Sequence, residues 1–187
     1  MYTCILVGNS SNILNKNLGS YIDGFDNVVR FNRFKIKGYE TDLGKKCTYW
    51  VLNYKLTTDN RNYLVKNLDK VRKDTYGLKQ ALILTTQEDK KNIIEKIKKK
   101  VDVDIVYQQL KKKFKHKPTT GYLTINYLLQ FFPQLVLIGF DFGKSNHYWG
   151  NHGISDVPGK HEWGKEKKYI DSLVRQNKIK IIQNEQS

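Results

Sequence analysis

Short apolar runs alternate with helix-like segments along the whole chain, and this alternation restricts the fold more than any other feature of the sequence. Runs rich in isoleucine, valine and leucine that end in glycine or polar residues are typical of strands buried on both faces. Such runs occupy residues 4–7, 28–31, 47–52, 81–84, 104–107, 135–138 and 179–182. Strands that alternate with helices join into a mostly parallel sheet, so we predict an α/β fold with about seven strands and helices on both faces.

The segments between these runs place apolar residues at helical spacing. They are centred on residues 14–22, 64–71, 93–101, 122–132 and 169–174. The fourth is apolar nearly all round, which predicts a deeply buried helix, and Thr120 is placed to cap its N-terminus. With 187 residues, no internal repeat and no linker, the chain is expected to form one domain spanning residues 1–187.

The first predicted strand leads into a polar turn, from Gly8 to Asn12. Gly8 permits a tight turn and the close approach of a ligand to the backbone. The polar residues after it are good N-caps, and the first amides of a helix have no partners inside the helix, so they can hold a phosphate. The three-glycine fingerprint of dinucleotide sites is absent, so this stretch is either a phosphate-binding turn or simply the first connection from strand to helix.

Further polar clusters follow other predicted strands or begin predicted helices. They lie at Asn32, Thr119–Gly121, Gly139 and His147–His161. In a parallel sheet, ligands bind beyond the carboxyl ends of the strands. We therefore expect these clusters to converge with the first turn on one functional cleft.

The net charge of +15 implies either an anionic partner or well-solvated helix faces. Lysine and arginine number 33 against 18 acidic residues, and lysines are concentrated at residues 96–100 and 111–117. An anionic substrate, an anionic membrane surface and nucleic acid would all suit this charge. A specific nucleic-acid site is not expected, because the lysines are not interleaved with aromatic residues that could stack on bases.

Three sequence features concern the cellular location. No apolar run approaches the roughly 20 residues of a membrane span, and no signal peptide precedes the first strand. Cys4 and Cys47 lie on or beside predicted strands and are expected to be buried and reduced. Together these features predict a cytoplasmic protein without a transmembrane anchor, which its charge could bring to a membrane surface.

Four segments carry an ordered set of motifs. The first begins with Val7-Gly8-Asn9-Ser10 and ends in Asp26-Asn27-Val28-Val29-Arg30-Phe31-Asn32. The second runs from Pro118-Thr119-Thr120-Gly121 to Gly139-Phe140, the third is His147-Tyr148-Trp149 with Asn151, and the fourth is His161 with Glu166. The order and spacing of these motifs resemble those of the animal-type sialyltransferases, glycosyltransferase family 29, over about residues 3–53 and 118–167.

The resemblance implies a Rossmann-like sheet of the GT-A type and a minimal, soluble member of the family. It implies an inverting transfer from CMP-sialic acid to a glycan hydroxyl that needs neither a metal ion nor a further cofactor. By resemblance, His161 is the general base and His147 contacts the departing phosphate. The implied residues around the donor nucleotide are Asn9, Ser10, Asn32, Thr119, Thr120, Gly121, Gly139, Phe140 and Tyr148.

The chemistry of such a transfer suits these residue types. An oxocarbenium-like centre and a phosphate leaving group develop, so an acceptor hydroxyl must lose its proton and the phosphate must be neutralised. Imidazole, with an ordinary pKa near ~6.5, suits the first task, and charge-assisted donors suit the second. Two alternatives stay open: Tyr148 and Trp149 are either ligand contacts or core aromatics, and Glu166 either orients His161 or caps the last helix.

Departures from the family pattern limit what the resemblance implies. The usual disulfide cannot form, because Cys4 occupies one of its positions and Phe132 the other. We also expect the chain to lack the family's membrane anchor and stem and to have short acceptor-binding loops, so the resemblance does not define the acceptor. Asp102-Val103-Asp104 matches a metal-binding Asp-x-Asp pattern, which we interpret as the start of a strand. Transfer of another CMP-activated 2-keto sugar acid, such as Kdo, and a basic nucleic-acid-binding domain are the alternative functions.

Overall fold

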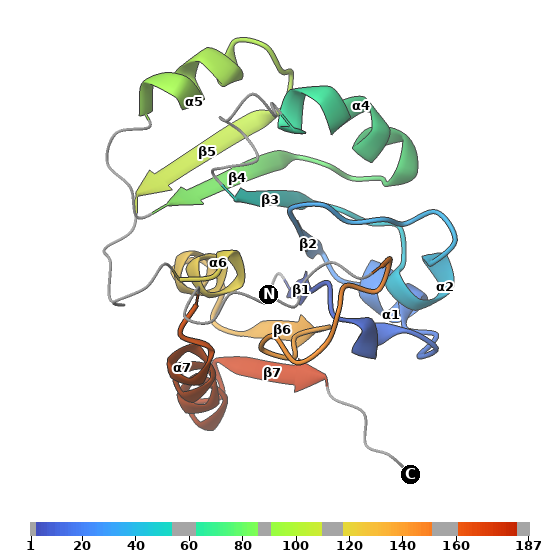
Figure 1. Cartoon of the computed structure of the whole chain (residues 1–187), viewed down its shortest axis with the longest axis vertical. Coiled ribbons are helices and arrows are strands. Elements are labelled where there is room, and N and C mark those ends of the chain that lie inside the picture. Colours follow the sequence, from blue (N-terminus) through green and yellow to red (C-terminus); the bar gives the residue numbers. More distant parts are fainter. Residues whose placement is uncertain (1–2, 54–62, 86–90, 110–117, 151–160, 183–187) are drawn as a thin grey trace.

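The computed structural model describes residues 3–53, 63–85, 91–109, 118–150 and 161–182 of the chain. Its centre is a sheet of seven strands in the order β5-β4-β3-β2-β1-β6-β7 (Figure 1). The strands are β1 (Cys4–Val7), β2 (Asn27–Phe31), β3 (Tyr49–Asn53), β4 (Gln80–Thr85), β5 (Asp104–Gln109), β6 (Leu135–Ile138) and β7 (Ile179–Ile182). Every neighbouring pair is parallel. Each predicted run therefore overlaps a strand, although Cys47 and Thr48 of the run 47–52 lie before β3, and the predicted sheet is confirmed.

Helices cover both faces of this sheet (Figure 1). They are the 3-10 helix η1 (Ser11–Ile13) and the α-helices α1 (Gly19–Asp23), α2 (Glu40–Leu43), α4 (Tyr63–Asp74), α5 (Lys91–Lys98), α6 (Thr120–Leu128) and α7 (Trp163–Arg175). On one face, α6 and α7 pack on a core that crosses the sheet from Leu82 to Ile179. On the other face, α4 and α5 cover β3 to β5, while α1 and α2 cover β1, β2 and β6.

The order of the strands reverses between β1 and β6. The chain adds strands outward from β1 to β5 on one side, and then places β6 and β7 on the other side of β1. The connections from the two neighbouring strands leave in opposite directions, which opens a crevice beyond their carboxyl ends. The register pairs Val7 with Arg30 of β2 and Ile138 of β6, so the residues just after these positions border the crevice.

The predicted helix over residues 14–22 is wrong, because the segment is broken in the middle. The 3-10 helix η1 ends at Ile13, and α1 begins only at Gly19. Asn15 and Asn17 between them have φ angles of 60° and 54°, which asparagine tolerates better than most residues. The carboxylate of Asp42 accepts hydrogen bonds from the amides of residues 15, 16 and 17, at 2.8, 2.7 and 2.8 Å. This distant side chain supplies the partner that a helix would otherwise have provided.

Helix α6 is as deeply buried as its composition predicts, but its ends differ. Most of its residues between 122 and 128 are buried against the sheet and α7. The N-cap is Thr119, whose hydroxyl accepts a hydrogen bond from the amide of Tyr122 at 3.1 Å, so the prediction of Thr120 as the cap was off by one residue. The helix ends at Leu128 and is followed by turn residues up to Phe131.

Both cysteines are free and buried, and burial raises the pKa of the Cys4 and Cys47 thiols to about 12. The predicted burial of both cysteines is therefore confirmed, and neither forms a disulfide; their reduced state stays a prediction. Phe132, which takes the place of the second cysteine of the expected disulfide, packs against the core cluster that contains Cys4. Among the helices in the described ranges, none has the length and apolar character needed to span a bilayer.

Candidate active site

A cavity of about 450 Å³ lies at the crevice between β1 and β6. It is lined by Gly8, Asn9, Ser10, Phe31, Asn32, Asn53, Thr119, Thr120, Gly121, Gly139, Phe140, Asp141, Phe142, Gly143, Ser145, His147, His161 and Trp163. The set includes both predicted histidines and every predicted donor-binding residue except Tyr148. The expected convergence of polar clusters at the carboxyl ends of the strands is thus confirmed, and we call this cavity the candidate active site.

Two glycines allow the loops after β1 and β6 to cross at the base of the site. A Cβ atom on Gly8 would lie 2.2 Å from the carbonyl oxygen of Gly139, a distance that no real side chain tolerates. The amide of Gly8 donates to Ile138 at 2.7 Å, and that of Ser10 donates to the carbonyl of Gly139 at 3.1 Å. Gly139 has a φ of +70°, which favours glycine. The close approach expected at Gly8 is therefore made by the protein's own backbone.

His147 is held by a short antiparallel pairing between its loop and the turn after β1. The amide of Tyr148 donates to the carbonyl of Asn9, and the amide of Ser11 donates to the carbonyl of Asn146, both at 3.0 Å. The imidazole of His147 lies 4.5 Å from the indole of Trp149, measured between ring centroids. These contacts fix a histidine that is far along the chain beside the first turn.

Asp141 shapes the loop that follows β6. Its carboxylate accepts hydrogen bonds from the amides of Gly143 and Ser145, at 3.1 and 2.6 Å. The hydroxyl of Ser145 in turn lies 2.8 Å from that of Ser10. The negative charge of Asp141 is therefore engaged by backbone donors, and the loop is tied to the turn after β1.

The two asparagines are each fixed at one end of the side-chain amide. The amino group of Asn9 donates to the carbonyls of Phe31 and Arg33, both at 3.2 Å, which leaves its carbonyl oxygen as the group that can serve a ligand. The carbonyl oxygen of Asn32 accepts the amide of Asn53 at 2.6 Å, which leaves the amino group. Asn9 can thus offer an acceptor to the cavity and Asn32 a donor.

The N-terminus of α6 presents open amides to the site. Thr119 uses its own amide and hydroxyl to donate to the two carboxylate oxygens of Glu166, at 2.8 and 2.6 Å. The amides of Thr120 and Gly121 form the first turn of the helix and have no partners within it. The predicted phosphate-binding turn after β1 opens only the three-residue η1, so α6 provides the better anion site.

Glu166 lies at the first turn of α7 and is only 3% exposed. Burial raises the pKa of its carboxyl group, and the hydrogen bonds from Thr119 partly oppose that shift. The sequence left open whether this residue orients His161 or caps its own helix. The structure instead places both carboxylate oxygens on the cap of the neighbouring helix α6, 47 positions earlier in the chain.

His161 lies just before α7, and its ring contacts that of Trp163 edge to face at a centroid distance of 5.3 Å. Trp163 in turn packs on the loop after β6, because a Cβ atom on Gly143 would lie 2.9 Å from its ring. The start of α7 and the β6 loop therefore form one wall, and His161 lies on it facing the same cavity as His147.

Two motif residues serve the framework. Tyr148 is buried and does not line the cavity. Its hydroxyl donates to the carbonyl of Lys35 at 2.7 Å and accepts a hydrogen bond from the amide of Lys35 at 3.0 Å. Burial raises the pKa of Tyr148 to about 12. This favours the core interpretation of Tyr148; its contact with a nucleotide stays a prediction. Arg30, also buried, donates to the carbonyls of Leu43 and Lys46, at 2.6 and 2.8 Å.

Some residues of the cavity were not predicted from the sequence. Asn53, Asp141, Ser145 and Trp163 all line it. Asn53 had a usable signal, since it directly follows the predicted strand 47–52, where a parallel sheet presents ligand groups. Trp163 had none, because only the packing of α7 against the β6 loop brings it to the site.

The Asp-x-Asp pattern lies away from the site. Asp104 begins β5, so it belongs to the amino-terminal edge of a parallel sheet whose carboxyl edge carries the cavity. Asp102 is exposed and pairs with Arg72 at 2.6 Å. The interpretation of the Asp-x-Asp pattern as the start of a strand is confirmed, because β5 begins at Asp104. Within the described ranges, no group of three or more histidine, cysteine or acidic side chains is placed to hold a metal ion.

Comparison with known proteins identifies similar chains and folds. The model of glycosyltransferase family 29 (sialyltransferase) matches residues 1–178. A curated relative from Gallus gallus, CMP-N-acetylneuraminate-beta-galactosamide-alpha-2,3-sialyltransferase 1, is 29% identical over 197 residues, which is 96% of this chain and 57% of the relative. The corresponding Homo sapiens protein is 26% identical over 96% of this chain and 58% of its own length. The chain thus spans less than two thirds of these relatives.

Solved structures of two sialyltransferases share the fold. A mammalian sialyltransferase in complex with Gal-beta-1-3GalNAc-ortho-nitrophenol gives a TM-score of 0.61 at 21% identity, over 97% of this chain and 69% of that one. CstII from Campylobacter jejuni, in complex with cytidine-5'-monophosphate, gives 0.65 at 19% identity, over 97% and 79%. These likenesses confirm the predicted Rossmann-like fold of the GT-A type.

Proposed function

This chain belongs to glycosyltransferase family 29, the sialyltransferases, and on that premise we propose that it moves sialic acid from CMP-sialic acid to a glycan hydroxyl. The observation that carries the proposal is the candidate active site, which gathers two histidines, two asparagines with one free polar end each, and an open helix N-terminus. The CMP complex of the related fold supports a cytidine nucleotide as the ligand.

The donor would bind through groups already held in position. The amides of Thr120 and Gly121 suit the phosphate, since the start of an α-helix favours negative charge. The free carbonyl oxygen of Asn9 can accept from a ribose hydroxyl or the cytosine amino group, and the free amino group of Asn32 can donate to an oxygen of the donor. Because each asparagine is fixed by the backbone, little side-chain entropy would be lost on binding.

The proposed reaction is a single displacement. The acceptor oxygen attacks the anomeric carbon of the sialic acid while the bond from that carbon to the phosphate oxygen breaks. The acceptor proton passes to a ring nitrogen of His161, and the electron pair of the broken bond leaves on the phosphate of CMP. His147 would donate to that phosphate as its charge develops. Attack from the face opposite to the leaving group inverts the anomeric configuration, and no metal ion takes part.

Release of CMP from a panel of CMP-sugars tests this function. CMP-sialic acid should be consumed faster than CMP-Kdo, and CMP and CDP should raise the melting temperature more than UDP or purine nucleotides do. Equal stabilisation by all nucleotides, together with no CMP release, would contradict the proposal. Faster release from CMP-Kdo would instead favour the alternative donor, whose nucleotide and phosphate would make the same contacts.

Other expectations from the sequence stay predictions. The cytoplasmic location and the affinity for an anionic membrane surface both follow from composition and charge. A basic nucleic-acid-binding domain loses support, because the family match covers residues 1–178 and accounts for the polar cavity.

A further inference from the structure

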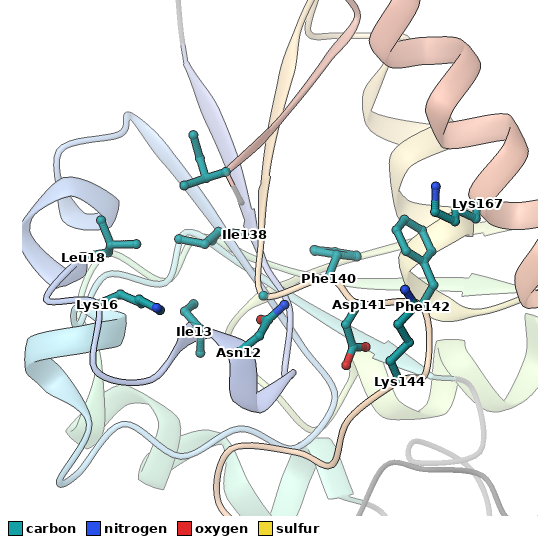
Figure 2. Close-up of a pocket in the computed structure, with 12 residues that line it drawn as sticks. Asn12, Ile13, Lys16, Leu18, Ile138, Phe140, Asp141, Phe142, Lys144 and Lys167 are labelled. Carbon is teal, nitrogen blue, oxygen red and sulfur yellow. The ribbon is translucent and has the colours of Figure 1, made fainter. Parts of the chain in front are cut away.

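A second cavity, of about 380 Å³, lies against the other side of the loop that follows β6. It shares the segment from Gly139 to Phe142 with the candidate active site. Its apolar lining comes from Ile13, Leu18, Ile138, Phe140, Phe142 and Ile182. Ile138 and Ile182 are the last residues of β6 and β7, so the cavity borders the carboxyl ends of these strands. Figure 2 shows the labelled lining residues. A volume of this size is in the range of small-molecule sites. We call it the lysine cavity, because Lys16, Lys144 and Lys167 complete its lining.

The lysine cavity carries an excess of positive charge. Lys167 forms an ion pair with Asp171 at 2.7 Å and lies 6.0 Å from the centre of the Phe142 ring. Lys16 and Lys144 form no ion pair with any carboxylate in the described part of the chain. The acidic residue in the lining is Asp141, whose oxygens accept backbone hydrogen bonds. The charge of Lys16 also interacts with the carboxylate of Asp42, but neither Lys16 nor Lys144 is within ion-pair distance of a carboxylate in the described residues, so both ammonium groups can turn to a ligand.

The two lysines approach the lysine cavity from opposite sides (Figure 2). Lys16 belongs to the broken segment between η1 and α1, where its backbone amide is bound by Asp42 at 2.7 Å, and its side chain is partly buried. Lys144 extends from the loop that Asp141 holds in shape. Both lysines thus start from backbone that is fixed by a carboxylate, although their ammonium groups can adjust to a ligand.

The lining determines which class of ligand fits. Ammonium groups at the rim suit a carboxylate or another single anionic group. Isoleucine, leucine and phenylalanine side chains below them suit the apolar face of a sugar ring, whereas a free inorganic anion would gain nothing from that floor. A sugar that carries an anionic group satisfies both parts of the lining.

We propose that the lysine cavity is a subsite for an acidic sugar residue of the acceptor glycan. The inference rests on the proposed function and extends it, because the shared wall places a ligand of this cavity next to the reacting centre. The chain would then prefer acceptors that already bear a carboxylate over neutral acceptors of the same core. The positive charge at this end of the sheet would then serve largely to bind such acidic acceptors.

Calorimetric titration with 3′-sialyllactose and lactose tests the subsite, with CMP present at saturation so that the nucleotide site is filled. The 187-residue chain should bind 3′-sialyllactose at least about tenfold more tightly than lactose, and the variant Lys16→Gln/Lys144→Gln should lose most of that preference. Lys99→Gln/Lys100→Gln is the matched control, because it removes two exposed lysines that follow α5, on the β3–β5 half of the sheet. This control should keep the preference.

Two outcomes would overturn the subsite: equal binding of both sugars, or an equal loss in the control variant. Displacement of 3′-sialyllactose by the same concentration of inorganic phosphate would also overturn it, since the cavity would then bind charge without the sugar. CMP release is measured separately. Normal release without the acidic preference would defeat only the subsite, whereas a lysine-dependent preference without CMP release would defeat only the proposed transfer.

Discussion

The two cavities on either side of the β6 loop are built on different principles. In the candidate active site, Asn9, Asn32 and Thr119 each spend part of their hydrogen-bonding capacity on the protein, which fixes the part that is left. In the lysine cavity, Lys16 and Lys144 extend long side chains whose ammonium groups have no ion-pair partner in the described ranges. One cavity offers fixed dipoles, and the other offers adjustable charge.

The difference matches what each cavity would have to do. Transfer requires the donor and the acceptor oxygen to be held in one geometry, so a rigid site with preorganised donors is favoured. Recognition of an anionic group on a distant sugar needs attraction more than exact geometry, and mobile ammonium groups supply it. Chemistry should therefore be sensitive to changes in the first cavity and acceptor preference to changes in the second.

The largest effect is expected from the histidines. His161→Ala should lower turnover by about 10²–10⁴-fold while CMP still binds, because a general base acts in the transition state. His147→Ala should weaken both CMP binding and turnover, because it removes a donor used in the ground state as well. Transfer rates and calorimetric CMP titrations of both variants, with Lys99→Gln/Lys100→Gln as a control outside both cavities, would check this. Near-normal turnover of His161→Ala would end its assignment as the base.

The shared wall predicts that one glycine supports both cavities. Gly8→Ala should destabilise the protein by about 3 kcal/mol, because its Cβ atom would collide with the carbonyl of Gly139 and displace the β6 loop. At temperatures where the variant is folded, it should bind both CMP and 3′-sialyllactose more weakly. Urea denaturation and the two titrations measure these effects.

Gly164→Ala is the matched control for that change, because a Cβ atom there meets nothing within 4 Å and lies on α7. Its stability should change by less than about 1 kcal/mol, in the stabilising direction. If Gly8→Ala is as stable as this control and binds normally, then the two loops do not need the close crossing, and the cavities are independent of it.

A smaller effect is expected from the buried carboxyl group behind α6. Burial raises the pKa of Glu166, so the folded state binds its proton more tightly than the unfolded state does. Its contribution to stability should therefore increase as the pH falls through the raised pKa, and level off below the ordinary pKa of a glutamate. Glu166→Gln should lack this gain. The unfolding free energy of the wild type should therefore rise relative to that of the variant as the pH falls from 7 to 5.

Glu95→Gln serves as the comparison for the pH measurement, since Glu95 is exposed and pairs with Lys98 on α5. Denaturant titrations at several pH values should show the same pH dependence for this variant as for wild type near neutral pH. An identical pH dependence in Glu166→Gln would mean that the carboxyl group titrates normally and that its burial has no energetic consequence.

The smallest expected effect is that of metal removal. The described residues that line the two cavities include no cluster of carboxylates, and the Asp-x-Asp pattern lies at the opposite edge of the sheet. EDTA should therefore leave CMP release unchanged, and Asp104→Asn should do the same. Loss of activity in EDTA, with recovery on addition of manganese, would reverse the interpretation of Asp102 and Asp104. It would mean that a metal ion takes part in the reaction.

Local signals in the sequence were enough to predict the sheet and most of the candidate active site. A buried parallel strand needs a continuous apolar run, so the seven strands are visible without any knowledge of their neighbours. Parallel strands present their carboxyl ends at one edge, so the polar residues that follow Val7, Phe31 and Ile138 were bound to meet there. The motif resemblance then gave these residues their expected roles.

Contacts between distant segments decided what the sequence could not show. The expected first helix is broken because Asp42 binds the amides of residues 15–17. Tyr148 is a core residue because its hydroxyl forms a hydrogen bond to the backbone of Lys35. Glu166 binds the cap of α6, 47 positions earlier in the chain. The lysine cavity likewise brings together Lys16, Lys144 and Lys167 from three separate segments. The periodicity of a sequence shows only which face of an element is apolar. The partner of a buried amide, hydroxyl or carboxylate is whichever group the folded chain brings within hydrogen-bonding distance, and that depends on the tertiary structure.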